Sequence, residues 1–223
     1  MPAKTTENAL RTVVLASTSP YRKALLERLG LPFETQSPDV DETPLPGEAP
    51  AATACRLAKA KARAVATRRA NALVIGSDQI ADANGVAIGK PCDHAAAVAQ
   101  LTALSGRSIV FHTAVALVDG ASGRCQLRLI DVTTRFRELT AAAIDSYLRR
   151  ERPYDCAGSV KAEGLGIALV ESIASDDPTA LIGLPLIAVV DLLQAEGVDV
   201  FGVNAESSAL RADRAGTAGG QRD

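Results

Sequence analysis

The sequence of 223 residues is poor in aromatic residues, which make up 3% of it, with four Phe, three Tyr and no Trp. It also lacks a basic excess, since 24 Lys and Arg stand against 26 Asp and Glu. Proteins that coat duplex nucleic acid need marked positive charge, and proteins that bind single strands stack successive bases on aromatic rings. Both shortages argue against a nucleic acid polymer as partner. Any base that the protein binds must be held by very few rings.

Histidine and cysteine are also scarce. The only histidines are His94 and His112, and the four cysteines, none of them in a CxxC pair, are Cys55, Cys92, Cys125 and Cys156. This pattern argues against a Cys/His zinc site, and at this length it favours reduced thiols over a disulfide framework. The Walker A, GxGxxG, HExxH and GxSxG motifs are absent, and a Ser–His–Asp triad gains no support.

Long hydrophobic runs are missing as well. The most apolar stretch, near residues 180–193, is interrupted by Gly183 and Pro185, so no segment has the apolar length of a membrane span. The first residues lack the apolar core of a signal peptide. We therefore expect a soluble, cytoplasmic protein without a membrane partner. Its length suits one large domain or two small lobes.

Apolar segments with the periods of strands and helices alternate along the chain, which predicts an α/β protein with a mixed sheet. Strands are expected at residues 12–16, 33–35, 72–76, 108–118, 125–137 and 167–173. Helices are expected from Pro20 to the stop at Gly30, then over residues 51–69, 94–104, 141–150 and 185–196. Asn84-Gly85 predicts a two-residue hairpin turn. Residues 1–11 are predicted to be a flexible leader and residues 203–223 a disordered tail.

A hydroxyl-rich turn, Ser17-Thr18-Ser19, leads from the first strand into a helix that begins at Pro20. Free backbone N–H groups and the positive end of the helix dipole suit a phosphate there. Arg22 in the first helical turn opposes the dipole, which is easier to understand if an anion binds. Taken alone, the stretch is better explained by a capped helix with a surface arginine.

Two further stretches carry carboxylates. The loop PDVDETPLPGE (38–48) could coordinate Mg²⁺ through oxygen, although its residues alone favour a solvated surface. Asp78 follows an apolar strand and is therefore expected at its carboxyl end, where α/β proteins place ligands. A carboxylate there can hold a metal or take a proton from water; the alternative is an Asp that caps a turn. Gly89-Lys90-Pro91 closes the adjacent hairpin and could bring a cation to the same place.

Together these stretches resemble the Maf family of nucleotide pyrophosphatases, in order, over about residues 12–202. The matching text is LASTSPYRKALLERLG (15–30), PDVDETPLPGE (38–48), RLAKAKA (56–62), GSDQ (76–79), GKP (89–91), CAGSVKAEGLG (156–166) and DPTALIGLPL (177–186). The resemblance implies one pyrophosphatase domain over residues 12–202, with an elongated mixed sheet flanked by helices and a cleft between two lobes. It also implies hydrolysis of a nucleoside triphosphate to the monophosphate and pyrophosphate, assisted by a divalent cation, Mg²⁺ or Mn²⁺.

The resemblance also assigns roles to individual positions. The residues that it implies for phosphate binding are Ser17, Arg22, Lys61 and Lys90. Glu42 and Asp78 are implied as metal ligands, and Asp78 as the proton acceptor. The residues of the acidic loop alone favour a solvated surface, whereas the resemblance implies that the loop lies at the metal site.

Three positions separate the dTTP/UTP pyrophosphatases of the family from a subgroup that acts on 7-methyl-GTP. Here they hold Tyr21, Gln79 and Glu163, which is similar to the 7-methyl-GTP subgroup, although that subgroup more usually has Trp at the first position. The adjacent N1–H and N2–H₂ donors of guanine suit one carboxylate such as Glu163, and burial of that carboxylate would offset a cationic base. A methylated, cationic base over a tyrosine ring gains roughly 0.5–2 kcal/mol.

Other functions stay open at this point. A dTTP/UTP pyrophosphatase, or a broad house-cleaning pyrophosphatase for modified purines, would use the same chemistry. A nucleotide-binding regulator of cell division and septum formation belongs to a different class. The intact Glu42, Lys61, Asp78 and Lys90 favour catalysis over binding alone. A homodimer is compatible with the sequence.

Overall fold

The structure is a computed structural model that describes residues 11–201. Except for Arg11, the predicted leader and tail lie outside these residues. The strands are β1 (Thr12–Leu15), β2 (Phe33–Thr35), β3 (Ala72–Ala83), β4 (Val86–Ile88), β5 (Ser108–Asp119), β6 (Cys125–Phe136) and β7 (Val170–Ala174). The helices are α1 (Pro20–Glu27), α2 (Pro50–Ala66), α3 (His94–Leu104), α4 (Ala141–Glu151) and α5 (Leu186–Ala195).

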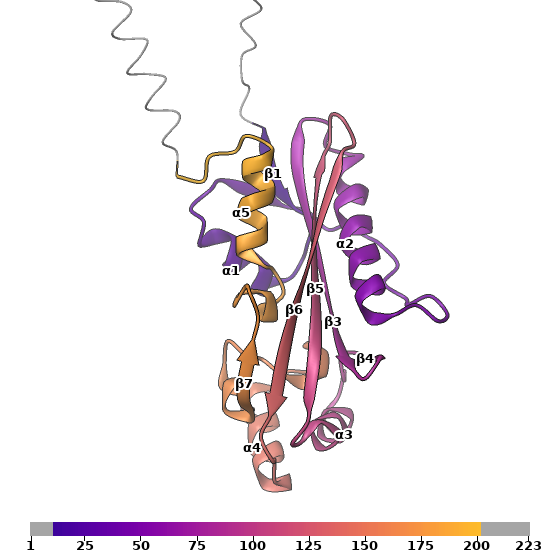
Figure 1. Cartoon of the computed structure of the whole chain (residues 1–223), viewed down its shortest axis with the longest axis vertical. Coiled ribbons are helices and arrows are strands. Elements are labelled where there is room, and N and C mark those ends of the chain that lie inside the picture. The colour runs from indigo at the N-terminus through magenta and orange to yellow at the C-terminus, as the bar shows by residue number, and fades with distance from the viewer. Residues whose placement is uncertain (1–10, 202–223) are drawn as a thin grey trace, which may run out of the picture.

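The strands form one open mixed sheet in the order β2-β1-β3-β5-β6-β7, and β4 pairs with the end of β3. β1 is parallel to β2 and β3, whereas the other pairs are antiparallel. The long strands β3, β5 and β6 run along the long axis of the molecule (Figure 1). The predicted class, an elongated mixed sheet flanked by helices, is confirmed.

The side chains of β3 alternate between the two faces of the sheet and contribute to three hydrophobic cores. Val74 packs with Ala58 of α2 on one face of the sheet. Leu73, on the other face, packs with Leu192 of α5. Further along the same face, Ala81 joins a third core that includes residues of α3 and α4. The sheet therefore carries α2 on one side and α1 and α5 on the other, with α3 and α4 at its far end (Figure 1).

β3 differs most from its prediction. The sequence predicts that it ends at Gly76, but it continues to Ala83 and pairs with β5 from Leu73 to Asp82. Asp78 therefore lies inside a strand, and the expectation that it follows a strand end is wrong. However, the parallel neighbour β1 ends opposite Ile75, so Asp78 lies just beyond the carboxyl end of β1. Polar side chains in this segment have partners on both faces of the sheet, which explains why a turn-like sequence forms a strand.

Other boundaries moved less. α2 ends at Ala66, three residues before its predicted end, and β7 begins only at Val170 because residues 165–169 form a 3₁₀ helix. The predicted hairpin turn is present, with positive φ angles at Asn84 (57°) and Gly85 (85°), as a type I′ turn requires. Side-chain caps form at the three predicted positions: Ser19, Asp93 and Thr140.

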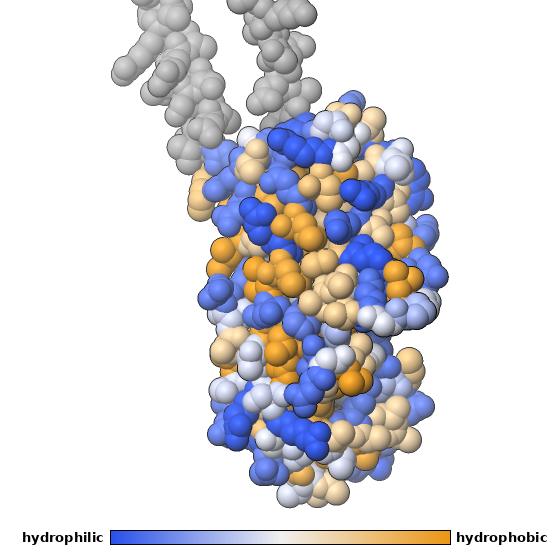
Figure 2. Space-filling model, turned by 45° about the vertical axis from the view of Figure 1, so that its right-hand side comes forward, coloured by the Kyte–Doolittle hydropathy of each residue, from blue (hydrophilic) through white to orange (hydrophobic). Residues whose placement is uncertain are grey.

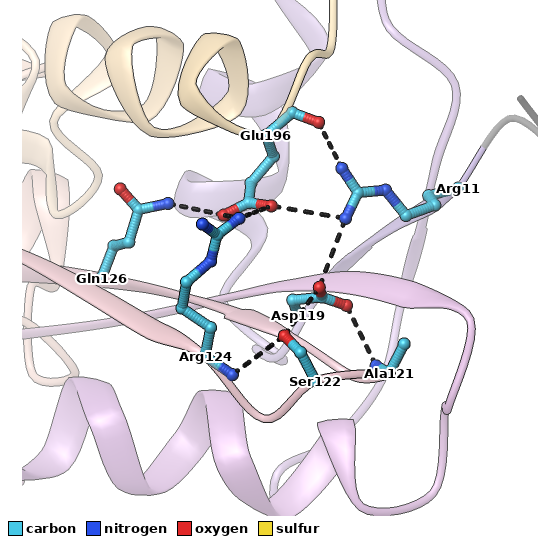
Figure 3. Close-up of polar contacts among 7 residues, drawn as sticks. All are labelled: Arg11, Asp119, Ala121, Ser122, Arg124, Gln126 and Glu196. Carbon is cyan, nitrogen blue, oxygen red and sulfur yellow. Dashed lines mark hydrogen bonds and ion pairs between the residues drawn. The ribbon is translucent and has the colours of Figure 1, made fainter.

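A polar cluster joins the end of α5 to the β5–β6 hairpin (Figure 3). The Glu196 side chain, 1% exposed, accepts hydrogen bonds from Arg124 at 2.7 and 2.8 Å and from Gln126 at 2.6 Å. Arg11 also contacts Glu196, at 3.3 Å, and pairs with Asp119 at 3.5 Å. This group, called the Glu196 cluster below, fixes α5 against the sheet.

Hydrophilic residues are interspersed among hydrophobic ones over the face of the molecule shown in Figure 2. Within residues 11–201, no helix combines the length and the apolar character that a membrane crossing needs.

Candidate active site

A cavity of about 570 Å³ is lined by the turn between β1 and α1, the acidic loop, α2, β3 and residues 87–90 at the end of β4. Its volume lies in the usual range for small-molecule sites. Eight of the predicted site residues line it: Ser17, Tyr21, Arg22, Glu42, Lys61, Asp78, Gln79 and Lys90. Glu163 is not in its wall. A second cavity, of about 490 Å³ between α3 and the β3–β4 hairpin, has no carboxylate among the described residues that line it.

The turn between β1 and α1 forms one wall of the cavity. Ser17, which is buried, accepts a hydrogen bond from the backbone N–H of Ser19 at 3.1 Å, and Ser19 caps α1 by accepting one from the N–H of Arg22 at 3.4 Å. Arg22 is half-buried, and its Nε donates to the carbonyl of Gly183 at 2.9 Å. The helix is thus capped as predicted, but Arg22 is anchored at the cavity and is no plain surface residue. Burial lowers the pKa of Arg22, while Asp78 and Glu42 raise it.

Lys61 lies at the centre of the site. It is 4% exposed, and its Nζ lies 2.6 Å from Asp78 Oδ1 and 2.7 Å from Glu42 Oε1. Gly76 makes this contact possible, because a Cβ there would lie 2.4 Å from the Ala58 carbonyl oxygen of α2. The missing side chain lets α2 approach β3 closely, which brings a buried lysine next to the strand that carries Asp78.

The pKa values of the two carboxylates that contact Lys61 are shifted in opposite directions. Burial raises the pKa of Asp78, and Lys61 and Arg22 offset this only in part. Burial also raises the pKa of Glu42, but the hydrogen bond and charge of Lys61, with Lys90 and Arg22, outweigh it, so the net pKa is lowered. Asp78 therefore accepts a proton more readily than an ordinary aspartate, whereas Glu42 stays ionised.

The donor set at this point fits a divalent cation that takes part of its ligands from a substrate. Residues 11–201 contain no group of three or more His, Cys, Asp or Glu side chains that could hold a metal ion. Glu42 and Asp78 already share one cation, the ammonium of Lys61. Mg²⁺ usually binds one or two carboxylates together with water and phosphate oxygens. Two carboxylates in a cavity large enough for a nucleotide satisfy that pattern.

Tyr21 lies in a strongly charged environment. The ammonium of Lys161 is 5.5 Å from the centre of its ring. Burial raises the pKa of Tyr21, as do the charges of Cys156, Asp155 and Glu163, while Lys161 lowers it. Glu163 itself is exposed, because the backbone N–H groups of residues 164 and 166 both bond to the Lys161 carbonyl and leave Glu163 on the outside of this turn. The buried carboxylate expected at this position is therefore absent, and a role of Glu163 in binding the base stays a prediction.

Gln79 points to the opposite face of β3 from Asp78, as its position in the strand requires. Its Nε2 donates to Thr113 Oγ1 at 3.0 Å and to the carbonyls of Ala180 and Leu181 at 2.9 and 3.0 Å. Ser77, on the same face, donates to the Gly183 carbonyl at 2.9 Å. Residues 180–183, called the 180–183 segment below, thus hold several side chains of the site by main-chain atoms.

Sequence reasoning missed this role of the segment, although DPTALIGLPL is part of the family resemblance. Asp177, 1% exposed, fixes the start of the segment by accepting hydrogen bonds from the backbone N–H of Thr179 at 3.0 Å and of Ile187 at 2.7 Å. An Asp followed by Pro and Thr before an interrupted apolar run is a signal for such a local turn.

The fold and the cavity define an α/β protein with a central cleft suited to an anionic ligand. The family model described as Maf-like protein matches residues 12–196. The chain belongs to the Maf family.

Several relatives named 7-methyl-GTP pyrophosphatase are similar to it over most of their length. One from Polaromonas sp. is 61% identical over 191 residues, 86% of this chain and 87% of the relative. One from Burkholderia pseudomallei is 57% identical over 199 residues, 88% of this chain and 93% of the relative. One from Methylobacillus flagellatus is 53% identical over 189 residues, 85% of this chain and 98% of the relative.

Proposed function

We propose that this protein is a nucleotide pyrophosphatase that hydrolyses 7-methyl-GTP to 7-methyl-GMP and pyrophosphate, and so removes a modified nucleotide from the cellular pool. The observation that carries the proposal is the buried Lys61 between Asp78 and Glu42 in the central cavity. The chain that forms this arrangement is 53–61% identical to relatives named 7-methyl-GTP pyrophosphatase.

The cationic side chains of the cavity bind the triphosphate. Arg22 and the N-terminus of α1, Lys61 of α2 and Lys90 after β4 all line the cavity. The charges of all three side chains act on Glu42. Fixed positive charge in a partly enclosed site stabilises the negative charge that develops on the phosphoryl oxygens and is the largest catalytic contribution we expect. A divalent cation, Mg²⁺ or Mn²⁺, held by Glu42 and Asp78 would add further charge neutralisation when bound.

Asp78 acts as general base. Its Oδ1 is held by Lys61, and Oδ2 takes a proton from a water molecule as the water oxygen bonds to the α-phosphorus. The bond between the α-phosphorus and the oxygen that bridges to the β-phosphate breaks, and pyrophosphate leaves with that oxygen. The raised pKa of Asp78 makes it a better proton acceptor than an ordinary aspartate.

Tyr21 and Gln79, which both line the cavity, contact the base. N7-methylation gives the purine a positive charge, which favours a position over the Tyr21 ring. Among the charges near this ring, those of Asp155 and Glu163 favour a cationic base, whereas the ammonium of Lys161, 5.5 Å from the ring centre, opposes it.

A substrate panel tests the proposal. Purified protein with Mg²⁺ or Mn²⁺ is given 7-methyl-GTP, GTP, ATP, dTTP and UTP, and pyrophosphate release is measured. We expect the highest kcat/KM for 7-methyl-GTP. A clear preference for dTTP or UTP would overturn the substrate, and no release from any of them would overturn the enzymatic function and favour a binding role in cell division.

A variant of Asp78 tests the mechanism. Asp78→Asn should lower kcat by about 10²–10⁴-fold, the usual contribution of a general base, with an unchanged circular dichroism spectrum. Asp191→Asn, an exposed position on α5, is the matched control and should keep full activity. Near-normal turnover of Asp78→Asn contradicts the assignment. The cytoplasmic location, the homodimer and the absence of nucleic acid or membrane partners stay predictions.

A further inference from the structure

The amide group of Gln79 is fixed in one orientation. Its Nε2 faces three oxygen acceptors, which are Thr113 Oγ1 and the carbonyls of Ala180 and Leu181, at 2.9–3.0 Å. Turning the amide over would place Oε1 against two carbonyl oxygens, which cannot donate a hydrogen bond. No hydrogen bond of the Gln79 side chain within residues 11–201 uses Oε1. Because Gln79 lines the cavity, the atom that it can offer to a ligand is an acceptor.

Thr113 determines part of this orientation. It is fully buried on β5, and its hydroxyl donates to the Ala180 carbonyl at 2.9 Å while accepting from Gln79 Nε2. One hydroxyl therefore both binds the amide and holds one of the two carbonyls that repel a turned amide. The hydroxyl donates its proton to the Ala180 carbonyl and accepts the Gln79 amide N–H with one lone pair.

The same segment also holds the phosphate side of the site. Gly183, three residues after Ala180, accepts the hydrogen bond from Arg22 Nε at 2.9 Å. A short piece of main chain thus fixes one side chain that faces the triphosphate and another that faces the base.

We propose that Thr113 is a positioning residue for base selection, which holds Gln79 so that Oε1 accepts a hydrogen bond from a ring N–H of the bound base. The proposal rests on the proposed function for the presence of a base next to Gln79. Guanine offers N1–H and N2–H₂ as donors, whereas the N1 of adenine is an acceptor and would face Oε1 without a hydrogen bond. The positive charge of the methylated guanine strengthens its N1–H as a donor, so the same contact favours the methylated base.

The test compares two substitutions of Thr113. Thr113→Val has nearly the same shape but no hydroxyl, and Thr113→Ser keeps the hydroxyl without the methyl group. For each variant and the wild type, kcat and KM are measured separately with 7-methyl-GTP and with ATP. We expect Thr113→Val to lower the ratio of kcat/KM for 7-methyl-GTP over ATP by about 3–10-fold, the effect of one hydrogen bond, because the methylated nucleotide binds with a higher KM. Thr113→Ser should keep the wild-type ratio.

A double variant guards against a general loss of structure. In a Gln79→Met background, which has no Oε1 to orient, Thr113→Val should leave the ratio unchanged. The proposal is wrong if Thr113→Val lowers both kcat/KM values by the same factor, leaves the ratio unaltered, or acts equally in the Gln79→Met background.

Failure of the proposed function would be seen separately, in the wild type. If the wild type prefers GTP, UTP or dTTP, which also carry a ring N–H, the substrate assignment fails. The ratio of kcat/KM for that nucleotide over kcat/KM for ATP then tests Thr113. We again expect Thr113→Val to lower this ratio and Thr113→Ser to keep it.

Discussion

Removing the charge of Lys61 should both destabilise the protein and shift the pH dependence of its activity. Lys61→Met keeps a side chain of similar length and apolar character but takes the ammonium away from Asp78 and Glu42. The Asp78 side chain is 7% exposed and that of Glu42 is 53% exposed. Asp78 therefore loses a partner in a poorly solvated place, whereas water replaces most of what Glu42 loses.

The magnitude follows from this difference in exposure. Removing one partner of a buried ion pair costs about 3–5 kcal/mol, and an exposed pair contributes at most ~1 kcal/mol. Asp78 relieves part of the cost by taking up a proton. We expect the free energy of unfolding to fall by about 3 kcal/mol at pH 8 and by clearly less at pH 5.

The sign of the pH dependence follows from the pKa of Asp78. This pKa is already raised above its ordinary value of 3.8, and Lys61 is the strongest influence that lowers it, so Lys61→Met raises it further. The folded variant then holds a proton on Asp78 that the unfolded chain releases near pH 4. The part of the destabilisation that comes from the charge of Asp78 is absent below that pH. It grows as the pH rises toward the pKa of folded Asp78, above which it is constant. The acid limb of kcat/KM, which reports the ionisation of Asp78, moves upward in the same direction.

Urea unfolding at pH 5 and pH 8, together with a pH profile of kcat/KM, measures both effects. Lys59→Met, a half-buried lysine on the same helix, is the matched control and should change neither. The reasoning is refuted if Lys61→Met loses the same stability at both pH values and the acid limb of its profile stays where it is in the wild type.

Three further predictions concern the framework of the site and its metal. Glu196→Ala, which removes the acceptor at the centre of the Glu196 cluster, should lower the free energy of unfolding in urea by about 1–3 kcal/mol and leave kcat/KM unchanged at 25 °C; a large loss of kcat/KM would contradict it. Gly76→Ala places a Cβ 2.4 Å from the Ala58 carbonyl oxygen and 2.5 Å from the Ala62 nitrogen, so α2 must move away from β3. We expect a loss of about 1–3 kcal/mol in the same assay and a lower kcat, and wild-type values for both would show that α2 need not lie so close. Treatment with EDTA should abolish pyrophosphate release and added Mg²⁺ or Mn²⁺ should restore it, whereas full activity in EDTA would exclude a required metal.

Local sequence patterns predicted the order of the elements and much of their detail. The caps at Ser19, Asp93 and Thr140 and the turn at Asn84-Gly85 depend on short-range chemistry, so they could be read from a few neighbouring residues.

The far half of β3 could not be predicted in this way. Gly76-Ser77-Asp78-Gln79 has the composition of a turn, and it forms a strand only because β5 pairs with it and α2 and the 180–183 segment bind its side chains. This is tertiary context overriding local propensity.

The sequence predicted which side chains line the candidate site, but it did not predict the main-chain groups that hold them. The family resemblance pointed to the residues that line the cavity, but the orientation of Gln79 and Arg22 depends on carbonyl groups of the 180–183 segment. Every residue has a carbonyl group, so its use as an acceptor leaves no trace in the sequence. Likewise, the exposure of Glu163 depends on how the turn at residues 161–166 folds back, which its glycines permit but do not determine.

The continuity of β3 restricts how the protein can admit its substrate. The strand pairs with β1 at one end and with β4 at the other, while β5 is hydrogen-bonded along nearly its whole length. Parts of the molecule that share such a strand have no hinge between them, and they cannot swing apart as rigid bodies without breaking the sheet. The acidic loop 38–48 and the β3–β4 hairpin with Lys90 lie at the cavity outside the central strands. We therefore expect substrate entry and product release to depend on these two segments. The cavity is thus expected to open through short surface segments and not through the opening of a domain.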